Sequence, residues 1–101
     1  MVEDLSKSDK EILRRIAVSL EDASVDVKAC NLKGAVPEVS NANDMARILV
    51  ERSPTSEYFR QIRRCTSYIN SVLLTISSSQ NAADQASRIV GMLEILAMVL
   101  R

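Results

Sequence analysis

Two cysteines and a short acidic run are the side chains in this sequence whose types could support chemistry. Histidine is absent, and with it the commonest general base and the commonest metal ligand of proteins. Cys30 and Cys65 are far apart in a chain with no other cysteine, which predicts neither a zinc site nor a disulfide framework. Each falls on an apolar helical pattern, so we expect both to be small core residues rather than nucleophiles. The sequence predicts no catalytic residue.

The acidic run consists of Glu21, Asp22 and Asp26. Carboxylates are ligands that Ca²⁺ and Mg²⁺ prefer, but no other ligand joins these three from the same stretch, which favours a solvated helix face. Gly34 and Gly91 stand alone, so the chain has no glycine-rich loop to hold a phosphate. We therefore expect no metal, no cofactor and no small-molecule substrate, and we expect that the protein is not an enzyme.

Charge and composition narrow the class of protein further. Thirteen acidic and thirteen basic residues cancel, so no overall field attracts the chain to nucleic acid or to anionic lipid. Scarce aromatics, absent tryptophan and only two glycines and two prolines favour an all-α chain with an aliphatic core. Its length predicts a single domain over 1–101. The charged stretch 1–7 is unlike a signal peptide and no stretch is long enough for a membrane span, so we expect a cytoplasmic protein.

A first helix is predicted over about 8–32. Ser8 and Glu11 have the spacing of a capping box, in which each side chain satisfies a backbone amide of the first turn. Gly34 is a natural left-handed stop and Pro37 forbids continuation of the helix. The apolar positions of this helix alternate spacings of three and four, as in a heptad seam, and they are Leu13, Ile16, Leu20, Ala23, Val27 and Cys30.

A connector over 33–40 and a short second helix are predicted next. Ser40 or Asn41 can cap this helix, which should end near Arg52. The apolar positions expected on its inward side are Met45, Ile48 and Leu49.

Two further helices complete the chain. Ser53 followed by Pro54 predicts an N-cap and the first residue of the third helix. Its expected seam is Tyr58, Ile62, Cys65, Ile69, Val72 and Ile76. The polar stretch 77–80 should end it, and Asn81 and Asp84 suit the cap and first turn of the last helix. The expected seam of the last helix is Ala86, Ile89, Leu93, Leu96 and Leu100.

These elements predict a small antiparallel helical bundle of three long helices plus one short helix. The short connection near 77–81 predicts that the third and last helices form a hairpin. We expect the first helix to pack across that hairpin and the short helix to close one end.

Surplus apolar surface is the main functional signal. Over 89–100 the only charge is Glu94, and a helix that is apolar on every side must be covered on every side. The apolar residues that lie off the predicted seams are Met92, Ile95, Met98 and Val99 on the last helix, Val18 and Val25 on the first, and Leu74 on the third. Either the short helix covers these residues or a binding partner does. Exposed apolar patches that are rimmed by charged residues usually bind other proteins. We expect a protein–protein interaction module that binds other proteins and forms a homodimer, of the kind found among regulatory adaptors, secretion-type chaperones and anti-activators.

An alternative function comes from residues 44–64. The segment 44–49, the turn residues 53–56 and a following run of arginines together resemble the helix-turn-helix of bacterial repressors. The resemblance implies that Ala46 is the small residue at the helix contact. It also implies contacts with phosphates or bases for Arg60, Arg63 and Arg64. The neutral chain lacks the electrostatic attraction that dominates DNA affinity, which favours instead a solvent-facing role for the arginines.

Overall fold

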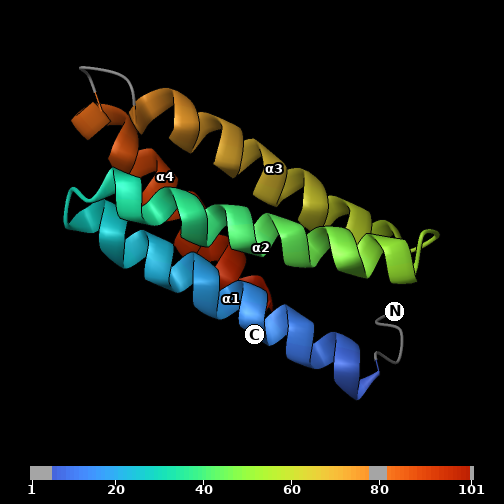
Figure 1. The fold of residues 1–101 in the computed structure, drawn as a ribbon. Coiled ribbons are helices and arrows are strands. Elements are labelled where there is room, and N and C mark those ends of the chain that lie inside the picture. The colour runs from blue at the N-terminus through green and yellow to red at the C-terminus, as the bar shows by residue number, and fades with distance from the viewer. Residues whose placement is uncertain (1–5, 78–81, 101) are drawn as a thin grey trace.

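The structure, a computed structural model, describes residues 6–77 and 82–100, and this part of the chain contains four helices. The helices are α1 (Lys7–Lys28), α2 (Leu32–Arg52), α3 (Glu57–Ser77) and α4 (Ala82–Leu100) (Figure 1). These ranges contain no strand, so the all-α prediction is confirmed. None of these four helices is long and apolar enough to cross a membrane.

The helices form a closed ring around one core. Each helix packs on its neighbour in the chain, and α4 packs on α1 as well. Short connections make successive helices antiparallel, so the predicted antiparallel bundle is confirmed. Two details differ from the expectation. Within the described residues α1 packs on α4 without packing on α3, and α2 runs along the bundle instead of closing one end of it (Figure 1).

The ring is uneven because α4 is inclined to the other helices. It begins beside the end of α3 and passes behind α2 towards the middle of α1 (Figure 1). Glu94, inside α4, accepts a hydrogen bond from Lys28 at the end of α1, with Nζ and Oε2 2.7 Å apart. The smallest of the four helix interfaces is the one between α3 and α4. We call the end of the bundle with the α1–α2 turn the closed end, and the opposite end, which α4 does not reach, the open end.

The first helix begins and ends earlier than the sequence predicts. Ser6 is its N-cap, with Oγ accepting from the Asp9 amide at 3.0 Å, so the capping box predicted at Ser8 is wrong. Ser8 lies inside α1 and its hydroxyl accepts from Arg52 Nη1 of α2 at 2.9 Å. The helix ends at Lys28 rather than near 32.

The turn between α1 and α2 explains the earlier end. Its left-handed residue is Cys30, with φ of 62°, and not Gly34. Asn31 caps α2, and its Oδ1 accepts from the Gly34 amide at 3.1 Å. A Cβ on Gly34 would overlap the Asn31 side chain. A larger residue at position 34 would therefore require the Asn31 capping side chain to move, so the restriction comes from this side chain and not from a left-handed backbone.

The connector predicted over 33–40 is wrong, because α2 is helical from Leu32 onwards. Pro37 lies inside the helix, where it costs one backbone hydrogen bond and about 3 kcal/mol. Ala35 and Val39 on either side of it are fully buried, and this packing holds the helix through the proline. The helix expected to be short therefore has 21 residues, and the shortest of the four is α4 with 19.

The boundary between α2 and α3 also differs from the expectation. The Ser53 amide donates to the Leu49 carbonyl at 3.0 Å and so closes α2, rather than capping α3. Ser56 occupies the capping role, because its Oγ accepts from the Phe59 amide at 3.2 Å. Residues 53–56 form a turn with Pro54 at its second position, a place that proline favours. The predicted end of the third helix over 78–80 and the cap at Asn81 lie outside the described residues.

The core follows the predicted seams on α1 and α4 and departs from them on α2 and α3. Except for Cys30, every seam residue predicted on α1 is buried, and the α4 seam is buried or half-buried. On α2 the buried positions are Ala35, Val39, Ala42, Ala46 and Leu49. Of the inward residues predicted there, Leu49 is buried and Met45 half-buried, but Ile48 is exposed, because the narrow alanine side of α2 packs inward instead.

On α3 two of the six predicted seam residues are wrong. The buried positions are Phe59, Ile62, Thr66, Ile69, Leu73 and Ile76. Thr66 can be buried because its hydroxyl lies 2.9 Å from Asn43 Oδ1 and 3.0 Å from the Arg63 carbonyl. The predicted Tyr58 and Cys65 are exposed, and Val72 is half-buried.

Candidate functional site

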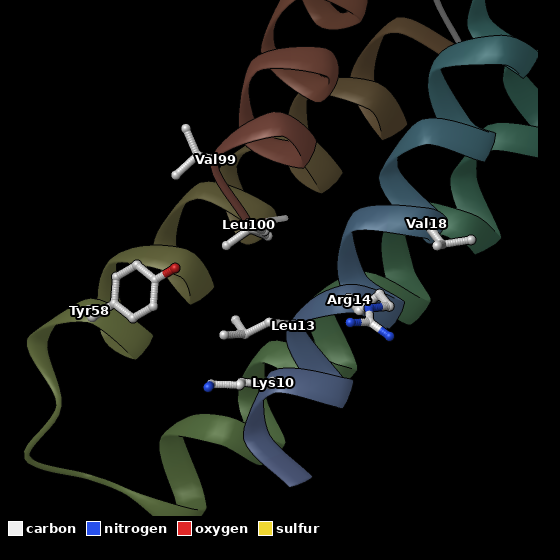
Figure 2. A pocket seen from close by; sticks show the side chains of 7 residues that line it. All are labelled: Lys10, Leu13, Arg14, Val18, Tyr58, Val99 and Leu100. Carbon is white, nitrogen blue, oxygen red and sulfur yellow. The ribbon is translucent and has the colours of Figure 1, made fainter. Parts of the chain in front are cut away.

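An open cleft of about 600 Å³ lies at the open end of the bundle, between the first turns of α1, the start of α3 and the end of α4. The residues that line it are Lys10, Leu13, Arg14, Val18, Tyr58, Val99 and Leu100 (Figure 2). Leu13 and Leu100 point into the gap from facing helices, and Lys10 and Arg14 lie along the α1 edge (Figure 2). We call this feature the open-end cleft.

The inclination of α4 produces this cleft. Tyr58, Cys65 and Val72 follow one another at seven-residue spacing, so they lie on one side of α3. Their exposure falls from Tyr58 and Cys65, which are exposed, to Val72, which is half-buried. Burial therefore increases towards the end where α4 lies beside α3. The predicted seam fails at Tyr58 and Cys65 because none of the described helices covers that side of α3 near its start.

The cleft has an apolar floor and a cationic edge. Lys10 and Arg14 are four residues apart on α1, so their side chains leave the same side of the helix. Among the described residues that line the cleft there is no aspartate or glutamate. Glu11 lies 3.8 Å from Arg14, but that pair is exposed and Glu11 also contacts Arg15. An exposed pair of this kind is weak, so Arg14 remains able to meet another carboxylate.

Tyr58 supplies the polar group on the opposite wall. Its ring centroid lies 5.9 Å from that of the buried Phe59. Burial raises the pKa of Tyr58 above its ordinary value of 10.0. The hydroxyl is therefore protonated at neutral pH and can donate or accept a hydrogen bond.

Beside the cleft, the outer side of α4 is apolar and exposed. Ile95, Met98 and Val99 are 61%, 69% and 60% exposed, and we call these three residues the α4 outer face. Met92 is half-buried and packs against the core. Within the described residues α2 does not pack on α4, so the alternative that the short helix covers this surface is wrong.

The other residues expected at an interface divide between two sides of the molecule. Val18 and Val25 are exposed on α1, and Val18 lines the open-end cleft together with Val99. Leu74 is also exposed, but it follows Ser67 by seven residues and so lies on the α2 side of α3. Six of the seven expected residues are exposed, and Leu74 is remote from the α4 outer face.

The three arginines of the alternative function gather at a second hollow. Arg60, Arg63 and Arg64 are exposed and line a groove of about 370 Å³ with Val50 and Ser67, between α2 and α3. Ala46 is buried, as expected of a helix contact. The two helices lie side by side as an antiparallel hairpin (Figure 1), whereas the helices of a helix-turn-helix cross at about 90–120°. DNA binding by 44–64 stays a prediction that a binding assay must test.

Both cysteines are exposed and free, so the expectation that they are core residues is wrong. Cys30 lies in the α1–α2 turn, beyond the last residue of α1. Cys65 lies on the side of α3 that α4 leaves uncovered.

Glu38 of α2 lies against the acidic run of α1, a contact that the sequence does not predict. Burial, together with a hydrogen bond to Asp26 and the negative charges of Asp26 and Asp22, raises the pKa of Glu38 from 4.5 to about 7. Glu38 Oε1 is buried without a hydrogen-bond partner. Position alone could not identify this pair, because Glu38 falls in the stretch predicted as a connector. Among the described residues no cluster of three ligands could hold a metal ion.

No protein-family model matches the chain, and no curated protein or solved structure matches it either. The function must therefore be inferred from the side chains of this chain alone.

Proposed function

We propose that the protein is a non-enzymatic protein–protein interaction module that acts through the α4 outer face and forms a homodimer. The observation that carries this proposal is the exposure of Ile95, Met98 and Val99, three neighbouring apolar side chains on the most apolar helix of the chain. The proposed role is that of a regulatory adaptor, chaperone or anti-activator in the cytoplasm.

Energetics support an interface on this helix. Full burial of a side chain of this size stabilises by about 1.5–3 kcal/mol, so covering all three contributes several kcal/mol to association. A formal net charge of zero means that two copies do not repel each other through their overall field. The absence of histidine from the sequence favours binding over catalysis.

Replacement of one apolar residue by a carboxylate tests the proposal. Ile95→Glu would place a charge in the interface without a partner, and a desolvated charge costs several kcal/mol. We expect the wild-type chain to run as a dimer in size-exclusion chromatography with light scattering. We expect Ile95→Glu to run at half that mass with its helical circular dichroism unchanged.

Ile48→Glu is the matched control. Ile48 is an exposed isoleucine on α2, and within the described residues α2 does not pack on α4. The same substitution there should leave the mass unchanged. A wild-type chain that is monomeric across a concentration series would contradict the homodimer. Dissociation by both variants would contradict the choice of surface.

A further inference from the structure

We propose that the exposed side of α1 is the centre of the homodimer interface, where the α1 helices of two copies cross in antiparallel orientation at Val18. Arg14 of each copy then faces Asp22 of the other. The inference rests on the proposed homodimer and deepens it, because it names a second helix of the interface and the charges that set the register of the two copies.

One ridge of α1 carries opposite charges at its two ends. Residues at a spacing of four lie along one ridge of a helix, and on α1 this ridge consists of Lys10, Arg14, Val18, Asp22 and Asp26. Two basic residues precede Val18, and two acidic residues follow it at the same distances. A copy of the ridge that is rotated by half a turn about Val18 places each charge opposite its counter-charge. The ridge is therefore complementary to a second copy of itself.

The neighbouring charges of α1 keep this polarity. Over 7–15 four basic residues outnumber two acidic ones, and over 21–28 three acidic residues outnumber one basic residue. Glu11 lies 3.8 Å from Arg14, but this pair is exposed and contributes little. Arg14 need not leave Glu11 in order to meet Asp22 of a second copy, because a guanidinium group has five N–H donors. The first half of α1 therefore attracts the second half of another α1.

The surface around α1 lets a second helix approach it. The Arg14 side chain is 75% exposed and Val18 is 47% exposed, and both follow Lys10 along α1 (Figure 2). Arg14 and Val18 line hollows on both sides of α1, which are the open-end cleft and a hollow of about 500 Å³ between α1 and α2. Helices that pack through their spacing-four ridges cross at about 50°, and this crossing aligns the two charged ridges along their length.

The proposed crossing is continuous with the α4 outer face. Val18 lines the open-end cleft together with Val99, and Lys28 of α1 is paired with Glu94 of α4. Of the nine large apolar side chains that are exposed among the described residues, five belong to α1 or to the α4 outer face. A second copy that docks on α1 therefore lies next to the α4 outer face. Apolar burial supplies affinity there, and the charges of α1 select the orientation.

Reversal of single charges tests the register. Arg14→Asp makes both positions that flank Val18 acidic, and Asp22→Arg makes both basic, so two copies of either variant meet with like charges. We expect each variant to raise the dissociation constant of the dimer about tenfold, because two exposed pairs per dimer change from attraction to repulsion. Sedimentation equilibrium measures the constant, and circular dichroism verifies that the helices are kept.

Two recoveries distinguish a facing pair from a general effect of charge. The double variant Arg14→Asp/Asp22→Arg restores opposite charges and should bind within about threefold of the wild-type dissociation constant. An equimolar mixture of the two single variants should form heterodimers, because every facing pair is then of opposite charge. Arg47→Asp is the matched control for net charge. Arg47 is an exposed arginine on α2 that lines neither hollow beside α1, so this variant should leave the constant unchanged.

Cross-linking tests the position of the two-fold axis. A residue on the axis meets its own copy, so Val18→Cys in a Cys30→Ser/Cys65→Ser background should form an interchain disulfide on mild oxidation. Val25→Cys is the matched control, since Val25 is an exposed valine seven residues further along α1. In the proposed crossing two copies of that residue are about 20 Å apart, which is beyond the reach of a disulfide.

The outcomes separate this inference from the proposed function. Dissociation by Ile95→Glu, with no effect of Arg14→Asp or Asp22→Arg, would overturn the inference and keep the α4 outer face as the interface. Weakening by both charge variants that neither the double variant nor the mixture reverses would also overturn it. A dimer that survives Ile95→Glu but follows the charges of α1 would support the inference and contradict the α4 outer face. A monomeric wild-type chain would contradict both.

Discussion

The two ends of α3 have the same heptad spacing but different surroundings. Near the closed end Leu73 and Ile76 are buried and Val72 is half-buried, because α4 begins beside them. Near the open end Tyr58 and Cys65 occupy positions equivalent to Val72 and are exposed. The difference teaches that a seam gives the direction of an apolar stripe, whereas burial depends on whether another helix reaches it.

The largest effect is expected at the closed end, where adjacent leucines differ most. Leu73 is fully buried and Leu74 is 49% exposed. Leu73→Ala should lower the free energy of unfolding by about 2–5 kcal/mol, through lost apolar contact and the cavity that remains. Leu74→Ala should change it by less than about 1 kcal/mol. Urea denaturation followed by circular dichroism measures both values. Similar losses for the two variants would contradict the orientation of α3.

The sequence predicted the helical class, the antiparallel order and the seams of α1 and α4, because these depend on apolar periodicity within one helix. It failed on α3 because two stripes of equal spacing compete there. One contains Cys65 and the other contains Thr66, and cysteine is the more apolar of these two side chains. Thr66 is buried because Asn43 on α2 accepts from its hydroxyl, and that tertiary contact cannot be derived from the spacing.

The open-end cleft could be predicted only in part. Val18 and Val99 lie off the predicted seams as surplus apolar residues, and both line the cleft. Lys10, Arg14 and Tyr58 could not be assigned to it, because their meeting depends on where α4 ends and how it is inclined. The predicted helix boundaries near Gly34 and Pro37 are wrong for a local reason. Both residues lie in the first two turns of α2, where the burial of Ala35 and Val39 stabilises the helix in spite of them.

An effect of intermediate size is expected at the closed end, where the free energy of unfolding should depend on pH. The pKa of Glu38 is raised to about 7 in the folded chain, above its ordinary 4.5, so the folded state binds more protons between these values. The contribution of protonated Glu38 to the free energy of unfolding is complete below pH 4.5 and is lost as the pH rises through about 7. Because the carboxyl is only half-buried, we expect the chain to be more stable at pH 5.5 than at pH 8 by about 1–2 kcal/mol.

The control for this effect removes the titrating group. Glu38→Gln keeps the size of the side chain and cannot ionise, so its free energy of unfolding should be nearly equal at the two pH values. Urea denaturation at each pH measures the difference. A wild-type chain that is more stable at pH 8 would show that the Asp26–Glu38 contact does not control the pH dependence.

The smallest effect is expected at the start of α3, on its arginine-lined side. Arg60, Arg63 and Arg64 are exposed, and Arg60 pairs with Glu57 at 3.3 Å within the same exposed surface. Replacing all three by glutamine should change the free energy of unfolding by no more than about 1 kcal/mol, because exposed ion pairs contribute little.

The same triple variant decides between the α4 outer face and the arginine groove as the functional surface. If the α4 outer face serves protein binding, the variant should keep the mass of the wild-type chain. DNA binding would instead depend on neutralised phosphates, so its affinity should fall steeply with salt and should be lost on removal of the three charges. A salt-sensitive DNA affinity that disappears in the triple variant would make the groove between α2 and α3 the functional surface and would displace the proposed function.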